Sequence, residues 1–436
     1  MTTEQNSKDL PDIEVGEDHV LAHNVDDEPV EANRRLFEGG LLKFVAMLAI
    51  AYSAFHLYSL NIAPLETWSF RIVHIAGALV LGFVLFAGAR FVSSEEGGAR
   101  HRWTTWISAG AMLPALYVLY QTFSFWQMVQ NGAMRIPAEL EVWHFGWPLL
   151  AATGAGIVMS WFHQRERSVF SVPDLVLIAC SLAVAAYFLV VYNTSMRMST
   201  GTSFAPVGIS FAAIAGTALI MELTRRVAGM ALVIIGLVFL AYVFAGPYLP
   251  GFLGYPGLSV QRFFSQVYTD AGILGPTTAV SSTYIILFII FAAFLQSSKV
   301  GDYFVNFAFA AAGRSRGGPA KVAIFASGLM GMINGTSAGN VVSTGSLTIP
   351  LMKKVGYSKQ SAGAVEAAAS TGGQIMPPIM GAGAFIMAEI TGIPYTEIAI
   401  AAIIPAILYF ASVYFMVDFE AAKTGMRGMR EDELPK

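Results

Sequence analysis

Long apolar stretches separated by short polar connections run through most of the chain, and this pattern predicts an all-α integral membrane protein. A helix needs about 20 mostly apolar residues to cross the hydrocarbon core of a bilayer, which is about 30 Å thick. Windows of this length recur along the 436 residues and predict about nine to ten transmembrane helices. The windows lie at 40–60, 71–92, 104–125, 146–163, 173–192, 206–224, 229–246, 274–298 and 397–417.

Two further segments, 319–350 and 360–388, are apolar on average but are interrupted by Gly, Ser, Thr, Asn and Pro. In the first, two apolar arms flank a polar middle from Asn334 to Asn340, which predicts a re-entrant helical hairpin whose arms each cross about half of the bilayer. In the second, glycines weaken the helix and two consecutive prolines remove backbone donors. We therefore expect a discontinuous helix that is unwound from Thr371 to Pro378.

Composition and the first residues narrow the class of protein. Only 13% of residues are charged, about half of what soluble domains carry, and the single cysteine excludes a disulfide framework. No basic tract suggests a nucleic-acid partner. Residues 1–36 are polar and acidic and lack the apolar core of a secretory signal, so we expect a disordered cytoplasmic tail.

The distribution of lysine and arginine predicts the orientation, because cytoplasmic loops are enriched in both. With a cytoplasmic N-terminus and a hairpin that returns to the side it entered from, 22 of the 26 basic residues fall inside. The other four are Arg71, Arg135, Arg197 and Arg262. A single crossing at 319–350 would separate the basic pairs at 314–316 and 353–354, so the charges favour a hairpin and place both termini in the cytoplasm.

The polar middle of the hairpin offers ligands of one kind. Amide and hydroxyl oxygens of Asn334, Thr336, Ser337 and Asn340 are hard donors, which suit Na⁺ or a polar substrate better than a transition metal. Glu366 follows Lys359 by seven residues, and we interpret it as an interfacial residue near the cytoplasmic end rather than a proton carrier.

Other polar residues have simpler interpretations. Asp174, Glu222 and Asp418 are expected to mark the ends of spans, and His74 and His144 are expected to be packed or interfacial rather than ligands. An intramembrane enzyme is the rival class, because GTSAG around Ser337 resembles a serine nucleophile turn. All seven histidines lie at or before position 163, and no HExxH motif or phosphate loop occurs, so we predict that the chain is not an enzyme.

Several long runs in the second half of the chain are distinctive. They are YLPGFLGYPG (248–257), GRSRGGPAKVAIFASGLMG (313–331), NGTSAGNVVSTGSLTIPLMKKVGY (334–357) and AGAVEAAASTGGQIMPPIMGAGAFIMAEITGIPY (362–395), with FMVDFEAAKTGMRG after them. From about Glu222 to Gly428 the chain resembles the large membrane subunit of tripartite ATP-independent periplasmic (TRAP) transporters, especially fused permeases of the TAXI branch. Earlier residues resemble the fused small subunit only in the pattern of their spans.

The resemblance implies an elevator-type carrier in the bacterial inner membrane. Sodium would drive uptake of a small organic acid, a carboxylate, dicarboxylate or amino acid, delivered by a TAXI-type periplasmic solute-binding protein. No cofactor is implied besides Na⁺ as the coupling ion. The implied sodium ligands are Ser337, Gly339, Asn340, Thr371, Gly372 and Pro377. The implied substrate-binding residues are Asn334, Thr336, Gly373 and Gln374.

The predicted organisation has four parts: the tail 1–36, a helical membrane region 37–228, the first half of a transport and scaffold domain 229–418, and a polar cytoplasmic tail 419–436. Family permeases contain two inverted repeats, whereas this sequence shows one hairpin and one broken helix. We therefore expect half of an inverted-repeat transporter, with the other half as a separate partner if it is encoded elsewhere. The alternative is a membrane scaffold or assembly subunit without transport of its own, or a truncated remnant.

Overall fold

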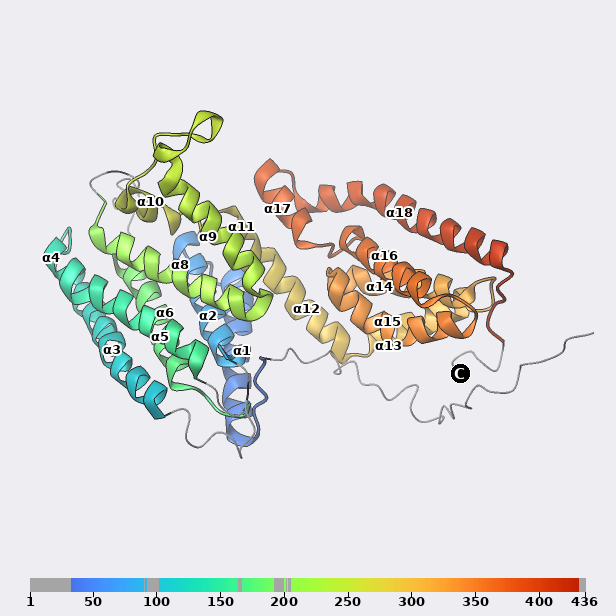
Figure 1. The fold of residues 1–436 in the computed structure, drawn as a ribbon, viewed down its shortest axis with the longest axis horizontal. Coiled ribbons are helices and arrows are strands. Elements are labelled where there is room, and N and C mark those ends of the chain that lie inside the picture. Colours follow the sequence, from blue (N-terminus) through green and yellow to red (C-terminus); the bar gives the residue numbers. More distant parts are fainter. Residues whose placement is uncertain are drawn as a thin grey trace, which may run out of the picture. The chain divides into compact units, whose positions relative to one another are not determined.

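The computed structural model describes residues 33–89, 91, 102–163, 167–191, 200, 202 and 205–430 (Figure 1). The described chain is helical, and its only β pairing is an isolated antiparallel bridge between Arg34 and Phe86. This confirms the predicted all-α class. Most of the predicted N-terminal tail, the last six residues and Arg197 lie outside the described residues.

The chain folds into two compact units. The described residues of 31–291 and 383–395 form the N-terminal unit, and those of 292–382 and 396–436 form the C-terminal unit. The helices of the N-terminal unit are α1 (Gly39–Asn61), α2 (Thr67–Leu85), α3 (Arg102–Gln130), α4 (Ala138–Leu140), the π-helix η1 (Glu141–Gly146), α5 (Trp147–Phe162), α6 (Val172–Val191), α8 (Val207–Ala228), α9 (Met230–Ala245), η2 (Gly246–Tyr248), η3 (Gly251–Leu253), α10 (Val260–Val267), α11 (Pro276–Val280), the π-helix η4 (Ser281–Ile285) and α17 (Ala382–Thr391). The helix α12 (Ile286–Ser297) carries the chain from this unit into the next.

Helix α6 forms the centre of the N-terminal unit, where α2, α3, α5 and α8 pack around it. Its side chains Leu177, Cys180, Tyr187 and Phe188 are fully buried. Tyr187 stacks on Phe145, with ring centroids 4.4 Å apart. These contacts explain why most of α6 is apolar, while Leu175, Leu182 and Leu189, which are seven residues apart, remain exposed on one face.

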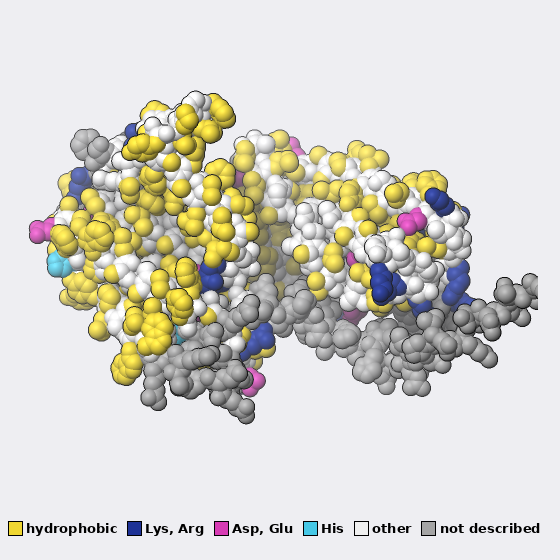
Figure 2. Space-filling view, in the orientation of Figure 1, with side chains coloured by type: hydrophobic (Ala, Val, Ile, Leu, Met, Phe, Trp, Pro, Cys, Tyr) yellow, Lys and Arg dark blue, Asp and Glu magenta, His cyan; other side chains and the backbone are white. Residues whose placement is uncertain are grey.

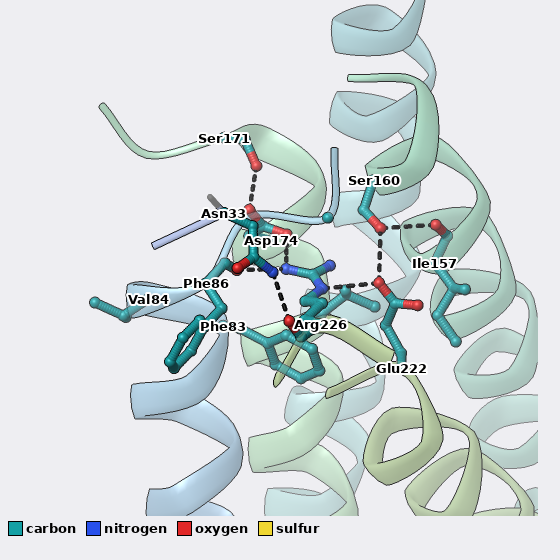
Figure 3. A network of polar contacts seen from close by, with 12 residues as sticks. Asn33, Phe83, Val84, Phe86, Ile157, Ser160, Ser171, Asp174, Glu222 and Arg226 are labelled. Carbon is teal, nitrogen blue, oxygen red and sulfur yellow. Dashed lines mark hydrogen bonds and ion pairs between the residues drawn. The ribbon is translucent and has the colours of Figure 1, made fainter. Parts of the chain in front are cut away.

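A buried network of charged groups joins the polar ends of α2, α6 and α8 (Figure 3). The Arg226 guanidinium donates to Asp174 Oδ1 at 2.7 Å, to Glu222 Oε1 at 2.7 Å and to the carbonyl of Phe86 at 2.9 Å. The other Asp174 oxygen accepts from Arg35. Both carboxylates were interpreted from the sequence as markers of span ends. The structure places them near helix ends, but buried: Asp174 pairs with Arg35 and Arg226 from other segments, and Glu222 pairs with arginines of its own helix.

Eight described helical segments are long and apolar enough to cross a membrane, and they coincide with eight of the nine predicted windows. The remaining window forms α3. Side chains of α9 are almost entirely exposed although the helix is wholly apolar, as lipid contact requires. Figure 2 shows hydrophobic side chains over much of the visible surface, with charged ones few and scattered. The chain is thus a multi-pass integral membrane protein.

The C-terminal unit is built around α14. Its elements are α13 (Val300–Ala312), α14 (Gly318–Asn334), α15 (Ser337–Lys354), α16 (Lys359–Gly372), the 3-10 turn η5 (Gly373–Ile375) and α18 (Tyr395–Thr424). Helix α14 packs against α13, α15 and α16 and is buried along most of its length. Helix α13 was not predicted, because at 13 residues with Asp302 near its start it does not resemble a span.

Candidate functional site

A tight turn at Gly335 and Thr336 joins α14 to α15, so that the two helices run antiparallel. Gly335 has a φ of +61°, in the left-handed region that glycine adopts without strain. A Cβ atom there would also lie 2.2 Å from the carbonyl oxygen of Met380. Glycine is required at this position both by the backbone conformation and by the close approach of the segment after α16.

The hairpin arms are longer than the sequence suggested. The 17 residues of α14 and the 18 of α15 correspond to about 25 and 27 Å, close to the full hydrocarbon thickness rather than to half of it. The helix continues through the polar positions Thr344 and Thr348, because their hydroxyls bond to carbonyls one turn earlier and to another helix. The start of α14 and the end of α15 still lie at the same end of the hairpin, as the distribution of basic residues in the loops requires.

The hairpin meets the end of α16 at a contact between two glycines. A Cβ atom on Gly331 would lie 2.2 Å from the Cα atom of Gly373, and one on Gly373 would lie 2.7 Å from the Cα atom of Gly331. Only glycine permits two backbones to approach this closely. Helix α16 ends at Gly372, and the non-helical stretch that follows η5 contains the Pro377–Pro378 pair, whose peptide bond is cis. The helix is therefore interrupted where the sequence predicted.

Several of the predicted site residues come together at this contact. Gln374 Nε2 donates to Ser337 Oγ at 3.1 Å, which links the broken helix to the hairpin tip. Asn340 is fully buried, and its Nδ2 donates to the carbonyl of Ser327 at 2.7 Å. Gly373 lies beside that amide, because a Cβ atom added to it would be 3.0 Å from Asn340 Nδ2. Four of the ten predicted residues thus lie around one small volume.

The remaining predicted residues lie nearby with different environments. Thr371 is exposed and its hydroxyl bonds to the carbonyl of Ala367 in its own helix. The carbonyl of Gly339 accepts from Ser343. Gly372 is packed against Tyr409 and Phe410, which leave no space for a side chain at that position. The other three, Asn334, Thr336 and Pro377, lie in the last turn of α14, the tip turn and the interruption after η5.

Two amide oxygens at the tip stand out because they have no partner. Asn334 Oδ1 and Asn340 Oδ1 are both buried and accept no hydrogen bond from any described residue. Buried polar atoms are nearly always bonded, so such exceptions require an explanation. Helices α14 and α16 also end here, and the carbonyl groups at a helix C-terminus carry a partial negative charge. Oxygen atoms without donors and two negative helix ends together favour a bound cation.

A buried carboxyl group lies deeper in the same unit, and the sequence interpretation of it was wrong. Glu366 is fully buried and is surrounded by the hydroxyls of Ser327, Thr344, Thr348 and Ser370, rather than lying at the interface. Two signals could have indicated this: Thr344 and Thr348 are one turn apart, as are Glu366 and Ser370, so each pair shares a helix face.

The arrangement defines a helical membrane protein with a polar hairpin packed against a broken helix, as found in secondary transporters. A family model described as the DctM component of the tripartite ATP-independent periplasmic transporter matches residues 215–436. This is just over half of the chain. The chain therefore belongs to the DctM family of TRAP transporter large permeases, which are inner-membrane proteins.

Individual relatives agree with this family over shorter stretches. The chain is 36% identical over 91 residues to the C4-dicarboxylate TRAP transporter large permease protein DctM of Vibrio cholerae serotype O1, covering 21% of this chain and 20% of the relative. It is 30% identical over 151 residues to the protein of the same name from Rhodobacter capsulatus, covering 34% of each. The chain thus spans about a fifth to a third of the length of these curated relatives.

Proposed function

We propose that this chain is a permease component of a TRAP secondary transporter, of the TAXI type, that couples the uptake of an organic acid to sodium entry. The observation that carries the proposal is the pair of buried amide oxygens without donors, Asn334 Oδ1 and Asn340 Oδ1, beside the C-termini of α14 and α16. Sodium prefers oxygen ligands, and helix C-termini carry a partial negative charge, so both features favour this ion.

The same turn offers a place for the negative charge of a substrate. Thr336 precedes α15 as its N-cap residue but makes no side-chain capping bond, so it does not satisfy the N–H groups of the first turn. Helix N-termini attract anions, and a carboxylate is the chemical class that fits here. Thr336, Ser337 and Gln374 are the side chains closest to this helix end that could orient it.

The wider assignment rests on the family and on the charges. A periplasmic solute-binding protein of the TAXI type, a small organic acid and a second permease half are the partners that the family resemblance supports. A cytoplasmic location of both termini is supported by the 22 of 26 basic residues that this orientation places inside.

The sodium proposal can be tested without knowing the substrate. Thermal unfolding of the purified chain should be measured in sodium chloride and in choline chloride of equal concentration. A ligand present at 100 times its Kd stabilises the folded state by about 2.7 kcal/mol, so sodium should raise the Tm. Asn340→Ala and Asn334→Ala should each weaken the apparent sodium affinity by about tenfold or more, since contacts to a charged group contribute about 1.5 to 3 kcal/mol.

Asn306→Ala is the matched control, because Asn306 is an exposed asparagine on α13 of the same unit. It should keep the full response to sodium. Equal Tm values in sodium and choline for the wild-type chain would contradict the cation site and would favour a scaffold role.

A further inference from the structure

The loop between α9 and α10 exposes two large aromatic side chains. Residues 246–257, which we call the aromatic loop, contain the turns η2 and η3 and project from one end of the N-terminal unit (Figure 1). Tyr248 is 87% exposed and Phe252 is 95% exposed. Figure 2 shows hydrophobic side chains over this projection. Contiguous exposed apolar side chains mark a contact with a membrane or with a partner.

The composition of the aromatic loop favours lipid over a soluble partner. The loop consists of Gly, Pro, Tyr, Leu and Phe alone, and residues 227–261 contain no Asp, Glu, Lys, Arg or His. Interfaces between soluble proteins carry a polar rim, which this stretch does not supply. Tyrosine is enriched at the surfaces of bilayers, where its ring lies beside the acyl chains and its hydroxyl reaches the headgroups.

The length of α9 places the aromatic loop at the edge of the hydrocarbon. Helix α9 starts at Met230, just after Arg225 and Arg226, and charged residues before a span lie near one surface of the bilayer. Its 16 residues rise by about 24 Å, and the three residues of η2 add about 6 Å. Together they match the hydrocarbon thickness of about 30 Å, so Tyr248 lies where the hydrocarbon meets the headgroups.

The aromatic loop folds back on the last turn of α9 and bonds to its carbonyl groups. The Tyr255 hydroxyl donates to the carbonyl of Val243, and the Tyr255 N–H donates to the carbonyl of Gly246 at 3.3 Å. In the other direction, the Tyr242 hydroxyl donates to the carbonyl of Leu253 at 2.9 Å. Carbonyl groups at a helix end in water can bond to water, whereas those at the edge of the hydrocarbon need partners within the protein. These bonds therefore suit a helix end that lies in the membrane surface.

Helix α10, which follows the aromatic loop, has its apolar side covered by the protein. It packs against α8, and Phe264 is buried there. Its other side carries Gln261, Arg262 and Gln266, which are exposed. A helix that anchors in a bilayer surface exposes its apolar side instead. The aromatic loop, rather than α10, is therefore the element that continues the apolar, exposed surface of α9.

We propose that the aromatic loop is a lipid anchor, in which Tyr248 and Phe252 insert into the interfacial layer of the leaflet where α9 ends. The lipid covers the two rings, and the bonds from Tyr255 and Tyr242 hold the loop against the helix so that it stays at this depth. The anchor involves neither the hairpin nor the broken helix. It therefore goes beyond the proposed sodium coupling, and either proposal can fail while the other holds.

Spin labelling of the full chain in vesicles of phosphatidylcholine and phosphatidylglycerol tests the proposal. Cys180 is the only cysteine and is fully buried, so a cysteine introduced at an exposed position can be labelled selectively. The label in Phe252→Cys should be accessible to oxygen, which concentrates in lipid, and protected from a water-soluble nickel chelate. Gln266→Cys is the matched control in water, and Phe239→Cys marks the lipid beside α9. The ratio of oxygen to nickel accessibility should be several-fold higher at Phe252 than at Gln266.

Two results would overturn the anchor. A label at Phe252 that is as accessible to nickel as the label at Gln266 would place the loop in water, where a soluble partner could cover it instead. A label that is protected from both oxygen and nickel would show that protein rather than lipid covers the loop. Tyr248→Cys provides a second, independent position with the same expected ratio if Phe252→Cys does not fold.

Discussion

A single methyl group added at Gly331 should force the hairpin away from the broken helix. The new Cβ atom would lie 2.2 Å from the Cα atom of Gly373, whereas ordinary contact begins at about 3.4 Å. The two backbones would therefore have to separate by about 1.2 Å. Because the opposing atom belongs to the backbone, no rotation of a side chain can relieve the contact.

The expected destabilisation follows from two opposing terms. Overpacking of a well-packed contact costs about 1 to 3 kcal/mol, and a backbone contact this short belongs at the upper end. Alanine is a better helix former than glycine by about 1 kcal/mol, which offsets part of this. The net loss is about 2 kcal/mol, which lowers the Tm by roughly 8 °C for a unit of about 130 residues.

Thermal unfolding of purified Gly331→Ala in sodium and in choline chloride measures both consequences. The Tm in choline should fall, and the additional stabilisation by sodium should be lost, because the C-termini of α14 and α16 would no longer converge. Gly363→Ala is the matched control: Gly363 lies on α16 with open space at its Cβ position, so that variant should be equally or more stable. If Gly331→Ala unfolds like the wild type and keeps its response to sodium, the argument from the glycine contact is refuted.

Three further predictions concern other parts of the chain. Asp174→Asn should destabilise the N-terminal unit by about 3 to 5 kcal/mol, since it leaves buried arginine charge without its partner, whereas Glu139→Gln at an exposed site should not change the Tm. Gly335→Ala should lower the Tm more than Gly356→Ala, because both have positive φ but only Gly335 faces a carbonyl oxygen. Burial raises the pKa of Tyr357 to about 12, so an absorbance titration should contain a late-ionising phenol that Tyr357→Phe lacks, and ionisation should destabilise the fold as pH rises above 10.

Periodicity and length were enough to predict the helices, because a spanning helix must satisfy its backbone internally and must be apolar to do so. The interruption after α16 was equally visible, since Pro377 and Pro378 cannot continue a helix. Helix α13 could not be predicted from length and periodicity, because it is short and carries Asp302 and Asn306. The length of the hairpin arms could not be predicted in this way either, because two long arms and two short arms return the chain to the same side and give the same distribution of loop charge.

The predicted site residues were identified by chemical type, but their roles depend on partners that are distant in sequence. Gly373 was expected to bind substrate, yet its clearest role is to let α14 approach, through a contact with Gly331 that is 42 positions away. Glu366 was misplaced for the same reason. Its distance from Lys359 suggested an interfacial position, whereas its four hydroxyl partners come from three helices that no local pattern relates to one another.

The charged network around Arg226 has a consequence for how the chain is made. Asp174 is translated 52 residues before Arg226, and ribosomes add about 5 to 20 residues per second. For several seconds the nascent Asp174 carboxylate therefore has only one of its two cationic partners, Arg35, which has already left the ribosome. A chain that ended between these positions would insert α6 into the bilayer with only one of the two arginines that pair with Asp174. The synthesis of α8 supplies the second arginine and completes the charged network.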